Sequence, residues 1–351
     1  MPSLPRDNDI LKGPSPMTLP RGSFFSRRLL LGAVTAVLPL TAARAQQAPL
    51  AMRPALDPLP PGWTSAEVID LWTGDAPNGP FKAQPAPADF PPVFFRNVER
   101  PGLHVFRPQT SNGSAVLIIP GGAYTFVVGT HEGAATAEAL AALGYTAFVL
   151  IHRLPAEGWT SPWDVPLQDA QRAVRLIRAN AGRLGYRADR VAALGYSAGG
   201  HLAASLATGY AEPVYEPRDE IDRQDARPSA VGLIYPVIAL EAPYTNPQSA
   251  VSLLGEAPDP AIVARRSPAS HVSAETPPAF LVHALDDTAV PPENTLMMLA
   301  ALRQAGVKAE AHLFQEGGHG FGLGPTNGSG GQWLTLFDLW LARALTTGPA
   351  V

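Results

Sequence analysis

Short apolar runs alternate with segments of helical periodicity over most of this chain. The apolar runs predict β-strands at 103–107, 115–119, 145–151, 191–194, 231–235, 279–283 and 309–314. Helices are predicted between or after them at 131–143, 167–184, 198–208, 294–305 and 332–345. Strands that alternate with helices in this order predict an α/β fold, with a mostly parallel central sheet flanked by helices.

The N-terminal segment departs from this alternation and predicts a signal peptide at 1–45. Arg27 and Arg28 stand before an apolar stretch that runs to Leu40, and a small-x-small cleavage site follows at 43–45. Paired arginines before leucines resemble the twin-arginine type of export signal. An ordinary Sec signal is an alternative interpretation, and so is a short membrane anchor if the segment is not cleaved.

The segment behind the predicted cleavage site, 46–62, is rich in proline and alanine and is expected to form an extended linker. The remaining 63–351 is expected to form one catalytic domain, because it is long enough to bury a large core. Export would place the protein in the periplasm or outside the cell, with no stable membrane association after cleavage.

Composition limits the partners that this chain can have. Its 26 Lys and Arg residues stand against 30 Asp and Glu residues, a net charge of −4. Nucleic acid is therefore not an expected partner, since phosphate binding needs a basic face. The chain has no cysteine, which excludes disulfides and thiolate chemistry.

Ligands of parallel sheets bind beyond the carboxyl ends of the strands, so chemistry is expected in the loops that follow strands. Such loops concentrate glycine, serine, aspartate and histidine here, at 120–124, 195–200, 286–287 and 317–322. These segments are far apart along the chain, but the predicted fold would bring them to one rim of the sheet.

The loop at 195–200 has the pattern of a nucleophile elbow, with Ser197 at a sharp turn from strand to helix. Glycines two positions to either side of the serine let the backbone pass without Cβ clashes. A serine hydroxyl also needs a base within hydrogen-bond distance, and that base needs a third group to orient it. Ser197 is therefore the candidate nucleophile.

The acid and the histidine of such an arrangement follow the serine along the chain. His319 is the expected base because it lies in a glycine-rich loop after a strand, whereas His312 lies within an alternating strand. Asp287 is preferred as the acid over Asp286, which is expected to cap the turn or face solvent. A turn cluster without chemistry is the alternative interpretation of this acidic pair.

A metal site built from His283, Asp286, Asp287 and His319 is a further alternative. It is disfavoured because His283 ends an apolar strand and the elbow accounts for the same residues without a metal. We therefore expect neither a metal nor a cofactor.

Backbone amides are expected to form an oxyanion hole, because acyl transfer builds negative charge on the carbonyl oxygen. Ala198 would supply one amide, and Gly122 and Ala123 would supply the other from the turn after a strand. An alanine at 123 would be strained if the turn needs a positive φ, which would weaken the assignment of its amide.

Aromatic residues near the same rim are candidates for a substrate pocket, namely Tyr124, Tyr196, Trp159 and Trp163. Each of them could instead serve only in packing. His201, one turn into the helix after the elbow, is expected to be a buried structural residue.

Several motifs together resemble the bacterial acetylxylan-esterase-like α/β hydrolases, a group of carbohydrate and feruloyl esterases. The matching segments are 71–77, 120–124, 169–175, 195–201, 234–237, 277–280 and 317–322. The resemblance covers about 63–345 and implies the α/β-hydrolase fold with hydrolysis of acyl esters, often acetyl groups on xylan. It also implies nucleophile, acid and base roles for Ser197, Asp287 and His319. Ala123 departs from the group, which usually has a third glycine there.

The leading hypothesis is a serine carboxylic-ester hydrolase that deacetylates xylan or related carbohydrate esters through an acyl-enzyme. A small-molecule or carbohydrate ester is thus the expected partner. One alternative is a serine peptidase of the prolyl-oligopeptidase type, although the chain has no room for the large additional domain of those enzymes. Another alternative is an inactive hydrolase homologue that only binds carbohydrate. The acyl group, the alcohol portion and the oligomeric state are not predicted.

Overall fold

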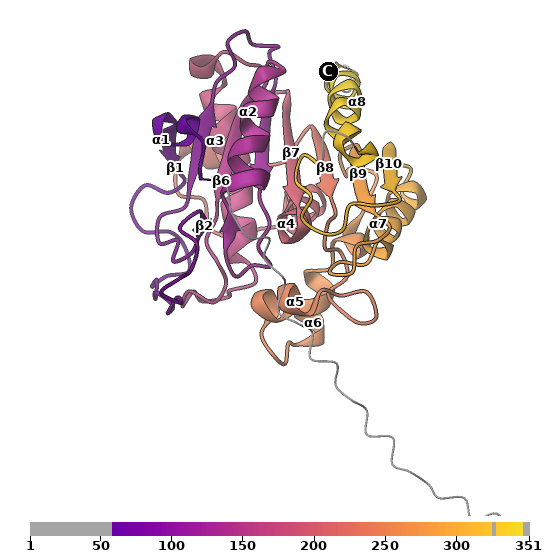
Figure 1. The fold of residues 1–351 in the computed structure, drawn as a ribbon. Coiled ribbons are helices and arrows are strands. Elements are labelled where there is room, and N and C mark those ends of the chain that lie inside the picture. Colours follow the sequence, from indigo (N-terminus) through magenta and orange to yellow (C-terminus); the bar gives the residue numbers. More distant parts are fainter. Residues whose placement is uncertain (1–57, 325–327, 347–351) are drawn as a thin grey trace, which may run out of the picture. The chain divides into compact units, whose positions relative to one another are not determined.

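The structure, a computed structural model, describes residues 58–324 and 328–346 (Figure 1). The predicted signal peptide at 1–45 and most of the predicted linker lie outside the described residues. The first helix, α1 (Pro61–Ser65), begins at the last two positions of that linker. Among residues 58–324 and 328–346, no helix combines the length and the apolar character needed to span a bilayer.

A single eight-stranded sheet forms the centre of the described part of the chain. Its strands, in spatial order, are β1 (Glu67–Asp70), β3 (Gly102–Phe106), β6 (Thr146–Ile151), β4 (Ala115–Ile119), β7 (Val191–Tyr196), β8 (Ala230–Ile234), β9 (Ala279–Ala284) and β10 (Ala309–Phe314). The pairs from β6 to β10 are parallel, whereas β3 pairs antiparallel with both β1 and β6. The predicted α/β fold with a mostly parallel sheet is confirmed.

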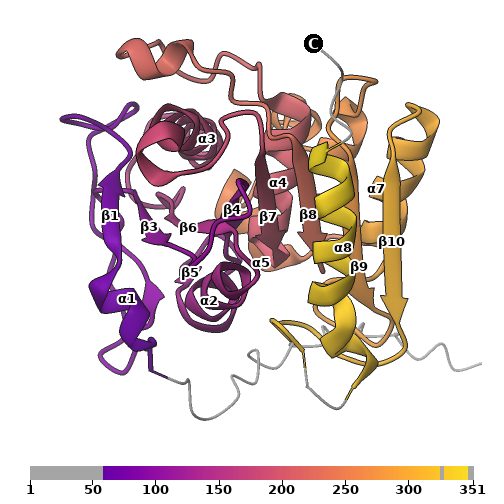
Figure 2. The ribbon, with the colours of Figure 1, turned by 90° about the horizontal axis from the view of Figure 1, so that it is seen from above.

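Helices cover both faces of this sheet (Figure 2). Helices α3 (Val165–Leu184), α4 (Ser197–Gly209) and α7 (Glu293–Gln304) pack on one face, and α2 (Ala135–Ala142) and α8 (Trp333–Thr346) pack on the other. The strands feed both layers because successive side chains of a strand point to opposite faces. Leu117 of β4 thus belongs to one apolar cluster, and Ile118 belongs to the other.

The structure adds elements that the apolar pattern did not predict. Strand β1 escaped prediction because its four residues alternate between half-buried and exposed positions, as suits the edge of a sheet. A two-stranded sheet pairs β2 (Phe94–Phe95) with β5 (Val127–Val128). Short helices α5 (Pro247–Leu254) and α6 (Pro260–Arg265) lie together at one end of the central sheet (Figure 1). Single 3₁₀ turns occupy Glu220–Arg223, Pro268–His271 and Ser329–Gln332.

The helix predicted at 131–143 begins with a π-helical turn, Thr130–Ala134, before it continues as α2. Such wide turns are frequent at functional sites. This one buries the side chain of Glu132, which is only 3% exposed, beneath the loop that follows β4.

Helix α3 carries a buried ion pair that ties the helix to the sheet. The Asp169 carboxylate accepts hydrogen bonds from Arg153 Nη2 at 2.7 Å, from the Arg153 backbone amide at 2.8 Å and from Trp72 Nε1 at 2.8 Å. Both charged side chains are fully buried. Arg153 also donates to the Pro77 carbonyl and to Gln168 Oε1, so the cluster joins residues 72–77 to α3.

Candidate active site

Ser197 stands at the junction of β7 and α4 with a φ of +52°, in the left-handed region. The turn requires glycine at positions 195 and 199, because no larger residue would fit there. A Cβ on Gly195 would lie 2.2 Å from the Gly199 carbonyl oxygen, and a Cβ on Gly199 would lie 2.2 Å from the Ile119 carbonyl oxygen. The sharp turn leaves the Ser197 side chain at the rim of the sheet, with 8% of the residue exposed.

Ser197, His319 and Asp287 come together from three separate loops. Ser197 Oγ lies 2.8 Å from His319 Nε2, and His319 Nδ1 lies 2.7 Å from Asp287 Oδ2. A carboxylate only accepts hydrogen bonds, so the proton of the neutral imidazole resides on Nδ1. Nε2 is then the acceptor that faces the serine hydroxyl. The arrangement can therefore move a proton from the serine to the histidine.

Asp287 is held in its ionised form by several donors. Its Oδ1 accepts from the amides of Ala289 and Val290, each at 2.9 Å, and its Oδ2 also lies 3.2 Å from His283 Nε2. Burial raises the pKa of Asp287, but hydrogen bonds from the two histidines and from Val290 outweigh it and hold the pKa well below the usual range.

The residues of the alternative metal site have other partners. His283 Nδ1 meets Thr295 Oγ1 at 2.8 Å, and Asp286 Oδ1 accepts from the Gly318 amide at 2.8 Å. Within 58–324 and 328–346, no group of three His, Asp or Glu side chains is arranged to hold a metal ion. Asp286 thus fastens the loop that carries His319.

The loop after β4 lies beside the serine, since a Cβ on Gly121 would lie 2.9 Å from Ser197 Cβ. Gly122, Ala123 and Tyr124 all have positive φ, at 129°, 51° and 57°. A Cβ on Gly122 would lie 2.0 Å from the Phe126 carbonyl oxygen, so this position needs glycine. The amides of Gly122, Ala123 and Ala198 have no hydrogen-bond acceptor anywhere in the described ranges. Free amides beside a nucleophile are the requirement for an oxyanion hole.

Ala123 adopts the left-handed conformation that the sequence flagged as strained. A non-glycine residue there costs about 1–3 kcal/mol, which the surrounding structure must offset. Two side-chain anchors flank the loop and supply that support: the Gly121 amide donates to Glu132 Oε2 at 2.7 Å, and Tyr124 Oη lies 2.8 Å from His201 Nδ1.

His201 fixes the direction of the Tyr124 hydrogen bond. Its Nε2 lies 2.9 Å from the Arg266 carbonyl oxygen, so Nε2 carries the proton. Burial lowers the pKa of His201 to about 4, so the ring is neutral and Nδ1 accepts the Tyr124 hydroxyl proton. His201 is thus a buried residue that anchors the loop.

Sequence reasoning missed a bridge between this loop and the histidine loop. Tyr235 Oη donates to Glu132 Oε1 at 2.9 Å and accepts from the Gly322 amide at 3.0 Å. The Tyr235 ring also meets the His319 ring edge to face, with centroids 5.0 Å apart. The segment 234–237 was noticed only as a matching motif, because nothing in a sequence shows which distant groups a tyrosine will join.

The aromatic pocket candidates divide into different environments. Tyr124 lines a cavity of about 430 Å³ next to the loop after β4. Trp159 is buried beneath the Arg153 guanidinium, 4.8 Å from its ring centroid, and half-buried Trp163 packs against the core.

Tyr196 does not belong to a pocket, which corrects its assignment as a pocket candidate. It is fully buried in the cluster under α2 and α8, where its hydroxyl pairs with Thr136 Oγ1 at 2.8 Å. The reason is strand alternation, which turns the residue before Ser197 toward the opposite face of the sheet.

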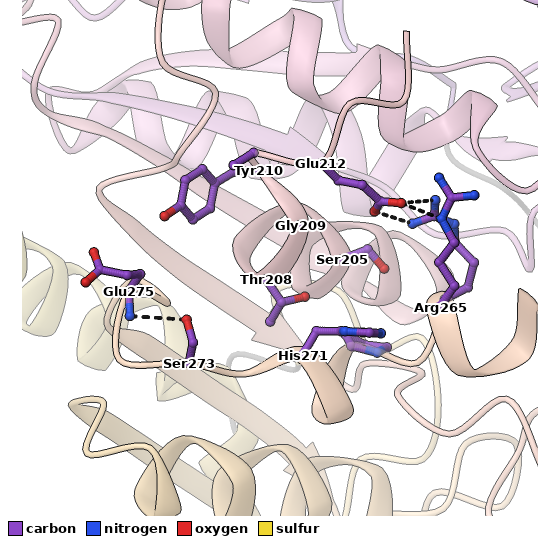
Figure 3. Close-up of a pocket in the computed structure, with 12 residues that line it drawn as sticks. Ser205, Thr208, Gly209, Tyr210, Glu212, Arg265, His271, Ser273 and Glu275 are labelled. Atoms are coloured by element: carbon purple, nitrogen blue, oxygen red, sulfur yellow. Dashed lines mark hydrogen bonds and ion pairs between the residues drawn. The ribbon is translucent and has the colours of Figure 1, made fainter. Parts of the chain in front are cut away.

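A separate cavity of about 370 Å³ lies at the C-terminal end of α4 (Figure 3). Ser205, Thr208, Tyr210 and His271 line it, and Glu212 points to the Arg265 guanidinium beside them. None of the candidate site residues lines this cavity.

A parallel sheet between helical layers, with a serine elbow, histidine and aspartate on loops after its strands, defines an α/β hydrolase. A family model described as BD-FAE matches residues 103–302, so the chain belongs to the BD-FAE family. The predicted acetylxylan-esterase-like resemblance is thereby confirmed.

Individual relatives agree with this family. The chain is 30% identical over 223 residues to an acetylxylan esterase of Xylanibacter ruminicola, covering 62% of this chain and 43% of the relative. It is 30% identical over 270 residues to endo-1,4-beta-xylanase B of Butyrivibrio fibrisolvens, and the match covers 73% of this chain and 42% of the relative. The chain thus spans less than half the length of these curated relatives.

A solved structure is similar over nearly its whole length. The acetyl ester-xyloside bifunctional hydrolase from Caldicellulosiruptor lactoaceticus superposes with a TM-score of 0.65 at 34% identity. The match covers 77% of this chain and 98% of that structure. The part of the chain that it covers therefore has the fold of a known hydrolase.

Proposed function

We propose that this protein is a serine carboxylic-ester hydrolase. The observation that carries the proposal is the 2.8 Å contact between Ser197 Oγ and His319 Nε2, with unpaired amides of Gly122, Ala123 and Ala198 close by. A hydroxyl next to a free basic nitrogen and free amide donors is what ester cleavage needs. The named esterases among the relatives support the same class of reaction.

The proposed reaction begins when Ser197 Oγ attacks the ester carbonyl carbon and its proton passes to His319 Nε2. Asp287 orients the imidazole and stabilises its charged form through Nδ1–H. The carbonyl oxygen becomes an oxyanion that the free amides bind. Collapse of this oxyanion intermediate breaks the bond between the carbonyl carbon and the alcohol oxygen. The alcohol leaves with the proton from His319 Nε2, and an acyl-enzyme remains. Water then attacks the acyl-enzyme by the same steps and releases the acid.

Acetylated xylan or a related acetylated carbohydrate is the proposed substrate class. An acetylxylan esterase and an acetyl ester-xyloside hydrolase stand among the relatives, which supports this choice. Acid release from acetylated xylan, methyl ferulate and a dipeptide amide should be measured side by side with p-nitrophenol release from p-nitrophenyl xyloside. Preference for the dipeptide amide would favour a peptidase, and saturable glycan binding without turnover would favour an inactive homologue.

Replacing Ser197 by alanine tests the mechanism directly. Ser197→Ala should abolish hydrolysis of p-nitrophenyl acetate, because no other group can form the acyl-enzyme. Ser205→Ala is a matched control, since Ser205 lies on the same helix and its hydroxyl has no hydrogen-bond partner among the residues that the structure describes. Turnover by Ser197→Ala close to that of this control would contradict the proposed nucleophile.

We also propose that 1–45 directs export and is removed, leaving the catalytic domain 63–351 in the periplasm or outside the cell. Mass spectrometry of the protein from the periplasm and the medium of a bacterial host tests this. A mature N-terminus at about 46 is expected, and an intact leader on all of the protein would contradict it.

A further inference from the structure

The cavity of about 430 Å³ next to the loop after β4 is lined by a single basic residue, Arg96. Tyr124 and Thr125, which directly follow the proposed oxyanion residue Ala123 in the chain, also line it, as does Gln84. The volume lies in the range of small-ligand pockets. The proposed oxyanion loop thus continues directly into the lining of this cavity.

Within the described residues, half-buried Arg96 forms no ion pair with a carboxylate, although its positive charge attracts the nearby Glu157 carboxylate. Its guanidinium carbon instead lies 5.0 Å from the centroid of the Phe90 ring. Stacking of this kind orients a guanidinium while its edge stays able to donate hydrogen bonds. By contrast, Arg100 on the same segment is paired with Asp70 at 2.8 Å and is exposed.

Glu157, the one carboxylate among the residues that line this cavity, is engaged elsewhere. Its oxygens accept from the backbone amides of Asn97 at 2.5 Å and of Val98 at 3.0 Å. Burial raises the pKa of Glu157, and backbone hydrogen bonds and the positive charge of Arg96 act against this shift. Glu157 therefore shapes the loop that carries Arg96 without forming an ion pair with its guanidinium.

Helix α5 adds neutral hydrogen-bonding groups to the lining of this cavity. Gln248 Nε2 donates to Ser252 Oγ at 2.9 Å, and Ser252 Oγ lies 3.1 Å from Thr125 Oγ1. Such amide and hydroxyl groups suit the hydroxyl groups of a sugar ring. Leu154 and Val251 add apolar surface to the same lining.

We propose that this cavity is a subsite for a sugar that carries a carboxylate, with Arg96 binding the carboxylate of a uronic acid unit in the ester substrate. The inference rests on the proposed esterase function and specifies its substrate class. A guanidinium binds a carboxylate through two parallel hydrogen bonds, and partial burial strengthens such charged bonds relative to those in water.

The test compares acetylated xylo-oligosaccharides with and without a uronic acid substituent. We expect kcat/KM of the native protein to be higher for the acidic substrate and Arg96→Gln to reduce that preference roughly tenfold. Hydrolysis of p-nitrophenyl acetate should change little, because this ester does not reach the subsite. Arg100→Gln is the matched control and should retain the preference. Equal use of both oligosaccharides, or a preference that Arg96→Gln leaves intact, would overturn the inference.

A binding measurement separates this inference from the proposed function. Calorimetry with unacetylated oligosaccharides should show tighter binding of the acidic one, and this difference should vanish in Arg96→Gln. If p-nitrophenyl acetate is not hydrolysed, the proposed function fails, and the calorimetric difference still decides whether the subsite exists. Equal binding of neutral and acidic oligosaccharides would overturn the subsite.

Discussion

Two buried carboxylates lie at different places in this molecule and have different kinds of partner. The side chains of Asp169 and Asp287 are both fully buried. Asp169 meets the guanidinium of Arg153, which is itself buried and permanently charged. Asp287 meets the imidazole of His319, whose other nitrogen faces the Ser197 hydroxyl.

The difference shows how burial of charge can serve either folding or chemistry. Within the described residues, the hydrogen-bond partners of Asp169 are the Trp72 indole, the Arg153 guanidinium and the Arg153 amide, which stay in one protonation state, so the cluster holds helix α3 and the 72–77 segment in place. The chain of contacts from Asp287 passes through a group that can gain a proton and ends at a partly exposed hydroxyl. A buried carboxylate is thus a candidate for chemistry when its partner can change protonation and its network reaches the surface.

The largest expected effect is on catalysis at Asp287. Asp287→Asn should lower kcat for p-nitrophenyl acetate by about 10⁴, the loss seen when a triad acid is made neutral. Asp286→Asn is the control and should have a much smaller effect, because Asp286 accepts a hydrogen bond from the Gly318 amide, whereas the His319 ring bonds to Asp287. The reverse ranking of kcat would move the proposed acid to Asp286.

Neutralising Asp169 should lower the free energy of unfolding. Asp169→Asn leaves Arg153 charged and buried without its counter-ion, which costs about 3–5 kcal/mol. Urea denaturation measures this loss, and kcat per folded molecule should change little. Asp70→Asn, which breaks the exposed pair with Arg100, should cost under about 1 kcal/mol. Comparable losses of stability in Asp169→Asn and Asp70→Asn would contradict the proposed role of Asp169 in holding the fold.

Acidic pH should lower the free energy of unfolding, in part because Asp287 becomes protonated. Its pKa is lowered in the folded state, so the unfolded chain binds the proton more readily. The stabilisation is complete above the unfolded pKa of about 3.9 and is lost as pH falls toward the folded pKa. The free energy of unfolding of the native protein should therefore fall more steeply below about pH 4 than that of Asp287→Asn. Parallel curves for the two proteins would contradict this contribution.

The smallest expected effect concerns Tyr235, which joins the two loops of the site. Tyr235→Phe removes the hydroxyl between Glu132 and the Gly322 amide while it keeps the ring against His319. Looser positioning of the loop that carries His319 should lower kcat roughly tenfold with little change in KM. Tyr244→Phe alters an exposed hydroxyl and should leave both constants unchanged. A change confined to thermal stability would make Tyr235 a purely structural residue.

Some strands and helices could be predicted from the amino-acid sequence, and others could not. Strands at 115–119 and 309–314 have the bounds that the sequence predicts, because glycine or proline lies close to both ends of each segment. The antiparallel direction of β3 could not be predicted, since the run that forms it has the same apolar character as those that pair in parallel. Helices α5 and α6 were missed because each is short and begins with proline.

The sequence by itself determined the fold class and the family. It also singled out Ser197 and His319 by their glycine-rich loops, and Asp287 by its place between them along the chain. These features are read from short motifs and their order, so they need no knowledge of which segments meet in space. Only the tertiary structure decided that Tyr196 faces the core, that Glu132 and Tyr235 join two loops, and that Arg96 and Glu157 line one cavity. Those facts depend on contacts between segments far apart in the chain, and such contacts exist only after the sheet and its helical layers have packed.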